Sequence, residues 1–124
     1  IENKIFDFEK KFINLINMSD LCITRAGATS LAEISFMKKP FIAIPLPTAK
    51  DNHQMENAKF YEERGCCWVI DQRILTKDKL LSVVLNILKK RSDFITKKNN
   101  FEKLNYKNSW NDVNQKLQRI INEN

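Results

Sequence analysis

The stretch from Ile23 to Pro45, ITRAGATSLAEISFMKKPFIAIP, indicates the fold of this chain. An apolar run leads into Arg-Ala-Gly-Ala, a segment with helical spacing follows, and a second apolar run ends at Pro45. The whole sequence has only two glycines, and Gly27 stands at the first of these junctions. We therefore expect a buried strand, a tight turn at Gly27, a helix over residues 29–37 and a second buried strand.

The same alternation of strands and helices continues on both sides of this stretch. Short apolar runs predict three strands, at Asp20–Thr24, Phe41–Pro45 and Cys66–Ile70. Helical spacing precedes the first strand and returns near residues 53–64. Gly65, the next residue, is a natural C-terminal cap for that second helix. Thr76 can cap a further helix, whose apolar residues are Leu80, Leu81, Val84, Leu85 and Leu88. Apolar strands separated by helices predict an α/β fold, a parallel sheet flanked by helices.

Composition limits the classes of function. The 124 residues include 21 basic and 15 acidic side chains, a net charge of +6, and the lysines are spread through the whole chain. Scattered charge does not favour a nucleic-acid partner. No apolar run approaches the roughly 20 residues that span a bilayer. Three cysteines, two of them adjacent, form neither a disulfide framework nor a metal spacing. We expect reduced thiols in a cytoplasmic protein, and no metal.

From Lys89 onward the sequence is densely charged, and its last segment again has helical spacing, over residues 109–121. We therefore divide the chain into an α/β domain over residues 1–90 and a C-terminal helical extension over residues 91–124.

Two clusters of polar residues follow predicted strands, where parallel sheets bind ligands. In the first, Gly27 leaves the backbone open, and Thr29 and Ser30 begin a helix whose free N–H groups favour a phosphate. Glu33 lies one turn further, where a carboxylate suits the hydroxyls of a ribose. In the second, Gln54 and Asn57 offer amides for sugar hydroxyls.

Other chemistries find less support in the sequence. The glycine fingerprints of dinucleotide-binding and P-loop proteins are absent. His53 is the only histidine, and no nucleophile arrangement is readable around it, so loop structure or substrate contact explains it better than catalysis.

At these clusters the sequence resembles the C-terminal domain of the MurG family, glycosyltransferases of peptidoglycan synthesis. The elements R-A-G-A-T-S-x-x-E and H-Q-x-x-N-A occur in the family's order and spacing, and the likeness runs from about Phe8 to Ile70. The resemblance implies a GT-B enzyme with two Rossmann-like halves, of which residues 1–90 form part of the C-terminal, UDP-GlcNAc-binding half. It also implies a cytoplasmic enzyme, peripheral on the inner membrane.

The resemblance assigns a role to each site residue. Glu33 would bind the ribose of UDP-GlcNAc, Thr29 and Ser30 the diphosphate, and the backbone of Ala28 the GlcNAc, together with Gln54 and Asn57. Arg25 would have a positioning or charge-balancing role, or form a structural salt bridge. Weaker candidates are Gly27, His53, and Phe8 and Glu9 near the uracil.

The family activity is inverting transfer of GlcNAc from UDP-GlcNAc to a lipid-linked muramoyl-pentapeptide, without a cofactor. The half that holds the acceptor and the general base is missing here, as is a glycine-rich loop of this half, so we expect no catalytic residue and no activity in this chain alone. The sequence departs from the family at Glu9, usually apolar, and at Lys38, usually glycine, so that the helix before it should end without its left-handed residue.

Two alternatives remain open. The chain could be the donor-binding subunit of another UDP-GlcNAc-using GT-B enzyme, such as the dolichyl-diphosphate GlcNAc transferase. It could also be a non-enzymatic basic module, and its lysine-rich segment allows contact with an anionic membrane surface.

Overall fold

The computed structural model describes residues 3–5, 12–48 and 52–104. Within them, three short strands form one parallel sheet in the order β1-β2-β3: β1 (Cys22–Thr24), β2 (Phe41–Ala43) and β3 (Cys67–Val69). The strands are in register, with Thr24 paired to Ala43 and Ala43 to Val69, so all three end at the same edge of the sheet. The predicted parallel α/β sheet is confirmed.

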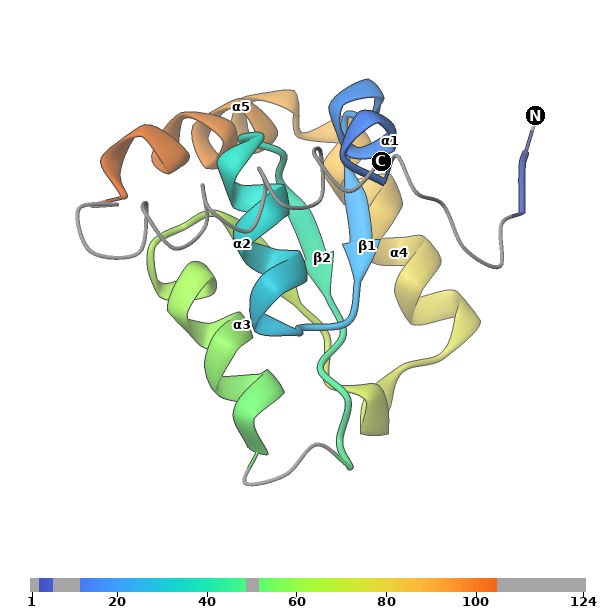
Figure 1. The fold of residues 1–124 in the computed structure, drawn as a ribbon. Coiled ribbons are helices and arrows are strands. Elements are labelled where there is room, and N and C mark those ends of the chain that lie inside the picture. The colour runs from blue at the N-terminus through green and yellow to red at the C-terminus, as the bar shows by residue number, and fades with distance from the viewer. Residues whose placement is uncertain (1–2, 6–11, 49–51, 105–124) are drawn as a thin grey trace.

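Helices connect and follow the strands (Figure 1). They are α1 (Phe12–Met18), α2 (Ala28–Phe36), α3 (His53–Glu63), α4 (Lys77–Lys89) and α5 (Arg91–Asn100), with short 3-10 helices η2 (Gln72–Ile74) and η3 (Phe101–Lys103). The predicted helices at 29–37 and 53–64 lie within one residue of α2 and α3. Thr76 caps α4 as expected, because its side chain accepts a hydrogen bond from the Lys79 N–H.

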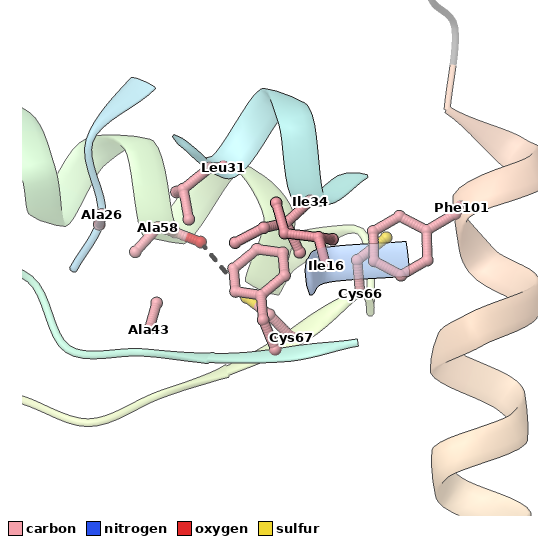
Figure 2. Packing of buried hydrophobic residues seen from close by; sticks show 10 residues of the cluster. Ile16, Ala26, Leu31, Ile34, Ala43, Ala58, Cys66, Cys67 and Phe101 are labelled. Carbon is pink, nitrogen blue, oxygen red and sulfur yellow. Dashed lines mark hydrogen bonds between the residues drawn. The ribbon is translucent and has the colours of Figure 1, made fainter. Parts of the chain in front are cut away.

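Two apolar clusters cover the two faces of the sheet. Because side chains alternate along a strand, Phe41 and Ala43 of β2 enter one cluster and Ile42 enters the other. Figure 2 shows the first cluster, with residues of α1, α2, α3 and η3 around the sheet. The second cluster joins the opposite face to α4 and to Phe94 of α5.

Only some of the apolar residues of α4 face the sheet. Leu80 and Val84 pack on the second cluster as expected, and Val83 and Ile87 join them. The other apolar residues named for this helix, Leu81, Leu85 and Leu88, are exposed. The sequence offers apolar residues on most of this helix, so spacing alone could not identify the buried stripe.

Both α2 and α3 end in the same hydrogen-bond pattern. After α2, Lys38 N–H donates to Ser35 O (2.9 Å) and Lys39 N–H to Ile34 O (3.2 Å). This is a Schellman motif, with Lys38 in the left-handed conformation at φ 57°. The expectation that this helix lacks its left-handed residue was therefore wrong, because a lysine adopts the conformation that glycine usually supplies.

Part of the predicted C-terminal extension packs on the sheet. Phe94 of α5 joins the second cluster, and Phe101 of η3 is fully buried in the first. Asn100 donates a hydrogen bond from Nδ2 to Gly65 O at 2.9 Å. The predicted helix over residues 109–121 lies outside the described residues.

Candidate functional site

The candidate site lies where the strands end, at the carboxyl edge of the sheet. Three connections meet there: the β1–α2 loop, the β2–α3 loop and the turn from β3 into η2 (Figure 1). The structure brings the two predicted clusters together at this edge, because Gln54 and Asn57 of α3 both contact the backbone of the β1–α2 loop.

Gly27 is the N-cap of α2, but it makes no tight turn. Its φ of −65° and ψ of 138° are extended values that any residue adopts, so the predicted reason for this glycine was wrong. A Cβ built on Gly27 would meet nothing within 4 Å. The absence of a side chain therefore leaves open space beside the backbone, which agrees with the other half of the prediction.

The first turn of α2 presents N–H groups at this edge. The helix begins at Ala28, its first helical backbone bond runs from Leu31 N–H to Gly27 O, and no side chain caps it. The N–H groups of Ala28, Thr29 and Ser30 precede that first bond, so they have no partner within the helix. Ala28 and Thr29 are exposed. Such a helix start attracts an anion, because the helix dipole adds to the hydrogen bonds.

Burial increases sharply along α2. Glu33, one turn after Thr29, is only 7% exposed and is engaged in an interaction in the structure. The sequence placed both residues on one face of the helix, ready for a ligand. The two differ because the first turn lies at the edge of the sheet, whereas the second packs inside the domain beside Leu31 and Ile34.

Gln54 and Asn57 bind backbone groups of the neighbouring loops. Oε1 of Gln54 accepts hydrogen bonds from Ala26 N–H (3.1 Å) and from Leu46 N–H (2.8 Å). Nδ2 of Asn57 donates to Ala26 O at 3.0 Å. The amides predicted to hold sugar hydroxyls thus already connect α3 to two loops.

Arg25 connects the same edge on its other side. One guanidinium nitrogen, Nη1, donates to Ile44 O at 3.3 Å and to Oε1 of Gln72. Arg25 therefore ties the end of β1 to the end of β2 and to η2. Within the described residues, Arg25 forms no salt bridge.

The turn that carries Gln72 is closed by an ion pair. The Asp71 carboxylate accepts hydrogen bonds from the Arg73 backbone N–H (2.9 Å) and from its guanidinium (2.6 Å from Nη2). These bonds lower the pKa of Asp71 to about 2, the side-chain bond contributing most. Asp71 is therefore ionised at neutral pH and holds η2 in place.

A cavity of about 380 Å³ adjoins these loops. It is lined by the β2–α3 loop, the start of α3 and the β3–η2 turn, through Pro45, Leu46, Pro47, Asn52, Met55, Asp71 and Arg73. This volume lies within the range of small-molecule sites. A second cavity of about 310 Å³, beside Asp20, Lys39 and Arg91, lies at the amino ends of the strands, at the opposite edge of the sheet from the candidate site.

The remaining candidates have other surroundings. His53 is the first residue of α3 and is exposed. Phe8 and Glu9 lie outside the described residues.

All three cysteines are free, and burial raises the pKa of Cys66 to about 11 and of Cys67 to about 12, so both stay protonated thiols. In the described part of the chain, no helix is both long and apolar enough to cross a membrane.

Sequence reasoning missed three residues of this edge. Ala26 is fully buried, and its backbone forms hydrogen bonds with the side-chain amides of Gln54 and Asn57. The Leu46 N–H donates to Gln54, and Gln72 accepts from Arg25. Backbone groups carry no signal in a sequence, so the first two could not be found. Gln72 gave only a weak signal, a polar residue just after a strand.

Similar proteins place the chain in a family. Residues 1–117 match the Glycosyltransferase family 28 C-terminal domain. The chain is 45% identical over all its 124 residues to the UDP-N-acetylglucosamine–N-acetylmuramyl-(pentapeptide) pyrophosphoryl-undecaprenol N-acetylglucosamine transferase of Pelagibacter ubique, and 35% identical over 88 residues to the enzyme of that name from Rickettsia bellii. These matches cover 35% and 25% of the two relatives, so the chain spans about a third or less of their length.

A solved structure agrees with the sequence matches. The crystal structure of Acinetobacter baumannii MurG superposes with a TM-score of 0.70 over 81% of this chain and 28% of that one, at 26% identity. The match in fold accompanies a sequence match over nearly the whole chain. The chain belongs to glycosyltransferase family 28, as part of its C-terminal domain.

Proposed function

We propose that this chain is the donor-binding part of an inverting glycosyltransferase. The whole enzyme would move GlcNAc from UDP-GlcNAc to a lipid-linked muramoyl-pentapeptide in peptidoglycan synthesis. The names of its relatives support the donor, the acceptor and the transfer. The observation that carries the proposal is the start of α2: N–H groups without a side-chain cap, beside a glycine with empty space around it. That arrangement suits the diphosphate of a nucleotide sugar.

The other site residues surround this helix start. In the proposal, the N–H groups and hydroxyls of Thr29 and Ser30 bind the diphosphate, the Ala28 backbone approaches the GlcNAc, and Glu33 accepts from the ribose. Gln54 and Asn57 lie beside the helix start, where Gln54 Oε1 and Asn57 Nδ2 bind the backbone of Ala26. The cavity next to Leu46 has room for a sugar ring.

The chemistry divides between this chain and the rest of the enzyme. The C4 hydroxyl of the muramoyl sugar attacks the anomeric carbon of GlcNAc, the bond from that carbon to the UDP oxygen breaks, and the configuration inverts. A base outside this chain takes the hydroxyl proton. The N–H groups of α2 stabilise the charge that develops on the departing diphosphate, because they already point at its position. This chain alone should bind the donor weakly and transfer nothing.

The acceptor suggests where the enzyme works. A lipid-linked substrate requires contact with a membrane, and a net charge of +6 favours an anionic surface. We therefore place the whole enzyme on the cytoplasmic face of the membrane, as a peripheral protein.

Titration with nucleotide sugars tests the proposal. Calorimetry of the chain should give binding of UDP-GlcNAc that is stronger than binding of UDP-glucose, and no response to a dinucleotide. In the full-length enzyme, Glu33→Ala should weaken donor binding by about 1–3 kcal/mol, the usual effect of removing a charged hydrogen-bond partner. Preference for the dinucleotide, or unchanged donor affinity in Glu33→Ala, would count against this assignment.

A further inference from the structure

The peptide groups of Ala26 lie beyond the reach of the sheet. β1 ends at Thr24, and the ladder to β2 continues only as far as the bond from Ile44 N–H to Thr24 O. Ala26 follows two residues later and is fully buried. Its N–H and C=O therefore need partners from elsewhere, because neither a strand nor water can satisfy them there.

Helix α3 supplies both partners. Gln54 Oε1 accepts from Ala26 N–H at 3.1 Å, and Asn57 Nδ2 donates to Ala26 O at 3.0 Å. The two side chains are three residues apart, which places them on one face of the helix. Gln54 Oε1 accepts a second bond from Leu46 N–H at 2.8 Å, so the β2–α3 loop is held by the same atom.

This geometry engages one atom of each amide, Oε1 of Gln54 and Nδ2 of Asn57. A carbonyl oxygen has two lone pairs, and two backbone N–H groups occupy those of Gln54 Oε1. That oxygen is then not available to accept from a sugar hydroxyl. Asn57 must present its NH2 group to Ala26 O, since only a donor can meet a carbonyl.

We propose that Gln54 and Asn57 are positioning residues for the donor site, acting through the backbone of Ala26. They fix the loop immediately before Gly27, and thereby the direction of the N–H groups that open α2. The inference rests on the proposed function, because it concerns how the diphosphate site is held. It goes further by assigning the effect of these amides to the UDP part of the donor.

The two possible roles differ in a measurable way. A residue that only contacts GlcNAc affects the binding of UDP-GlcNAc and leaves the binding of UDP unchanged. A residue that positions the start of α2 affects both ligands by the same factor, since both carry the diphosphate. The ratio of the two dissociation constants therefore separates the roles, whatever the absolute affinity.

The experiment uses the full-length enzyme with Gln54→Met, which keeps the length of the side chain and removes both amide groups. Asn57→Asp keeps its shape and cannot donate to Ala26 O. Lys59→Met places the same new side chain at an exposed position of the same helix as the control. Calorimetry gives the dissociation constants of UDP and UDP-GlcNAc, and hydrogen exchange gives the protection of the Ala26 and Leu46 amides.

We expect Gln54→Met and Asn57→Asp to raise both dissociation constants about tenfold, with their ratio unchanged, since small misplacement of a site costs that much or more. Lys59→Met should match the wild type. Gln54→Glu keeps an oxygen that accepts from both loops, so it should restore the protection of Ala26 and Leu46 that Gln54→Met loses.

Unchanged affinity for UDP in Gln54→Met, with a loss for UDP-GlcNAc alone, would overturn the positioning role and return Gln54 to the sugar. Wild-type enzyme that binds neither ligand would refute the proposed function instead. In that case hydrogen exchange still tests whether Gln54 holds the Ala26 backbone: normal protection of the Ala26 amide in Gln54→Met would overturn that role. If Gln54→Met does not fold, Asn57→Asp carries the same comparison of UDP with UDP-GlcNAc.

Discussion

The two glycines of this chain differ in conformation and in surroundings. Gly65 follows α3 at φ +73°, and a Cβ there would lie 2.5 Å from Nδ2 of Asn100. Gly27 precedes α2 in an extended conformation, and a Cβ there would meet nothing within 4 Å. The fold itself requires the first glycine, whereas neither backbone conformation nor packing in the described part of the chain requires the second.

This difference teaches how to separate structural from functional sequence signals. A residue that the folded chain explains needs no ligand, and Gly65 is explained twice, by its positive φ and by its contact with Asn100. Neither of these reasons applies to Gly27, and a ligand that approaches the backbone at the start of α2 would account for it. The proposed donor is such a molecule, so substitutions at the two glycines should have effects of different kinds.

The largest effect should follow Gly65→Ala. Alanine in the left-handed conformation costs about 1–2 kcal/mol, and displacement of Asn100 loses a hydrogen bond worth about 1 kcal/mol. We expect the free energy of unfolding to fall by about 2–3 kcal/mol in chemical denaturation. Asn100→Ala is the matched control, since it removes only the hydrogen bond that ends at Gly65 O. A loss no larger than that of the control would mean that the left-handed conformation carries no cost.

The second effect should follow Gly27→Val, and it should be on binding. A Cβ at Gly27 meets no atom within 4 Å and the φ there is allowed, so the free energy of unfolding should change by less than about 1 kcal/mol. The dissociation constant of UDP-GlcNAc should rise at least about tenfold, roughly 1.4 kcal/mol, because the valine occupies the approach to the backbone. Calorimetry on the full-length enzyme measures this change.

Gly27→Ala provides the graded control for that prediction. Its smaller side chain should give an intermediate loss of affinity at similar stability. Affinity that is equal in the wild type and both variants would remove the functional explanation of Gly27.

Much of the fold could be predicted from local pattern. The strands at Phe41–Ala43 and Cys67–Val69 lie inside the predicted apolar runs, and Thr76 caps its helix. These features depend on neighbouring residues, which the sequence displays directly. The conformation of Lys38 could not be predicted, because residue type disfavours a left-handed lysine and only the tertiary structure imposes it.

The meeting place of the two polar clusters was predictable, and the contacts of their residues were not. The two clusters do meet at the carboxyl edge, as strand order in parallel sheets requires. The partners of Gln54 could not be read, because Ala26 and Leu46 contribute only backbone N–H groups, which every residue possesses. The burial of Glu33 was missed for a related reason, since helical spacing gives a face but not the depth to which that face is covered.

A third substitution, Lys38→Gly, extends the comparison to the other helix end. Both helices end in Schellman motifs, one at Gly65 and one at Lys38. Glycine should relieve the left-handed lysine and stabilise the protein by about 0.5–1 kcal/mol, partly offset by loss of the exposed ion pair with Glu102. Chemical denaturation of Lys38→Gly in the wild-type and Glu102→Gln backgrounds separates the relief of the left-handed lysine from the loss of the ion pair. A destabilised variant in the Glu102→Gln background would show that Lys38 contributes more than its conformation costs.

The smallest effect concerns the turn that holds Gln72 against Arg25, next to the Gly27 loop. The bonds from Arg73 lower the folded-state pKa of Asp71 to about 2, below its ordinary value of 3.8. The stabilisation is therefore complete above pH 4 and is lost as the pH falls from about 4 to 2. Asp71→Asn keeps an oxygen for the Arg73 N–H but removes the charge, so its melting temperature should fall less steeply than that of the wild type over this window. Above pH 5 the two curves should run parallel. Equal slopes below pH 4 would mean that the ion pair does not stabilise the folded turn. The donor affinity of Asp71→Asn at pH 7 should change less than that of Gly27→Val, because the turn itself remains.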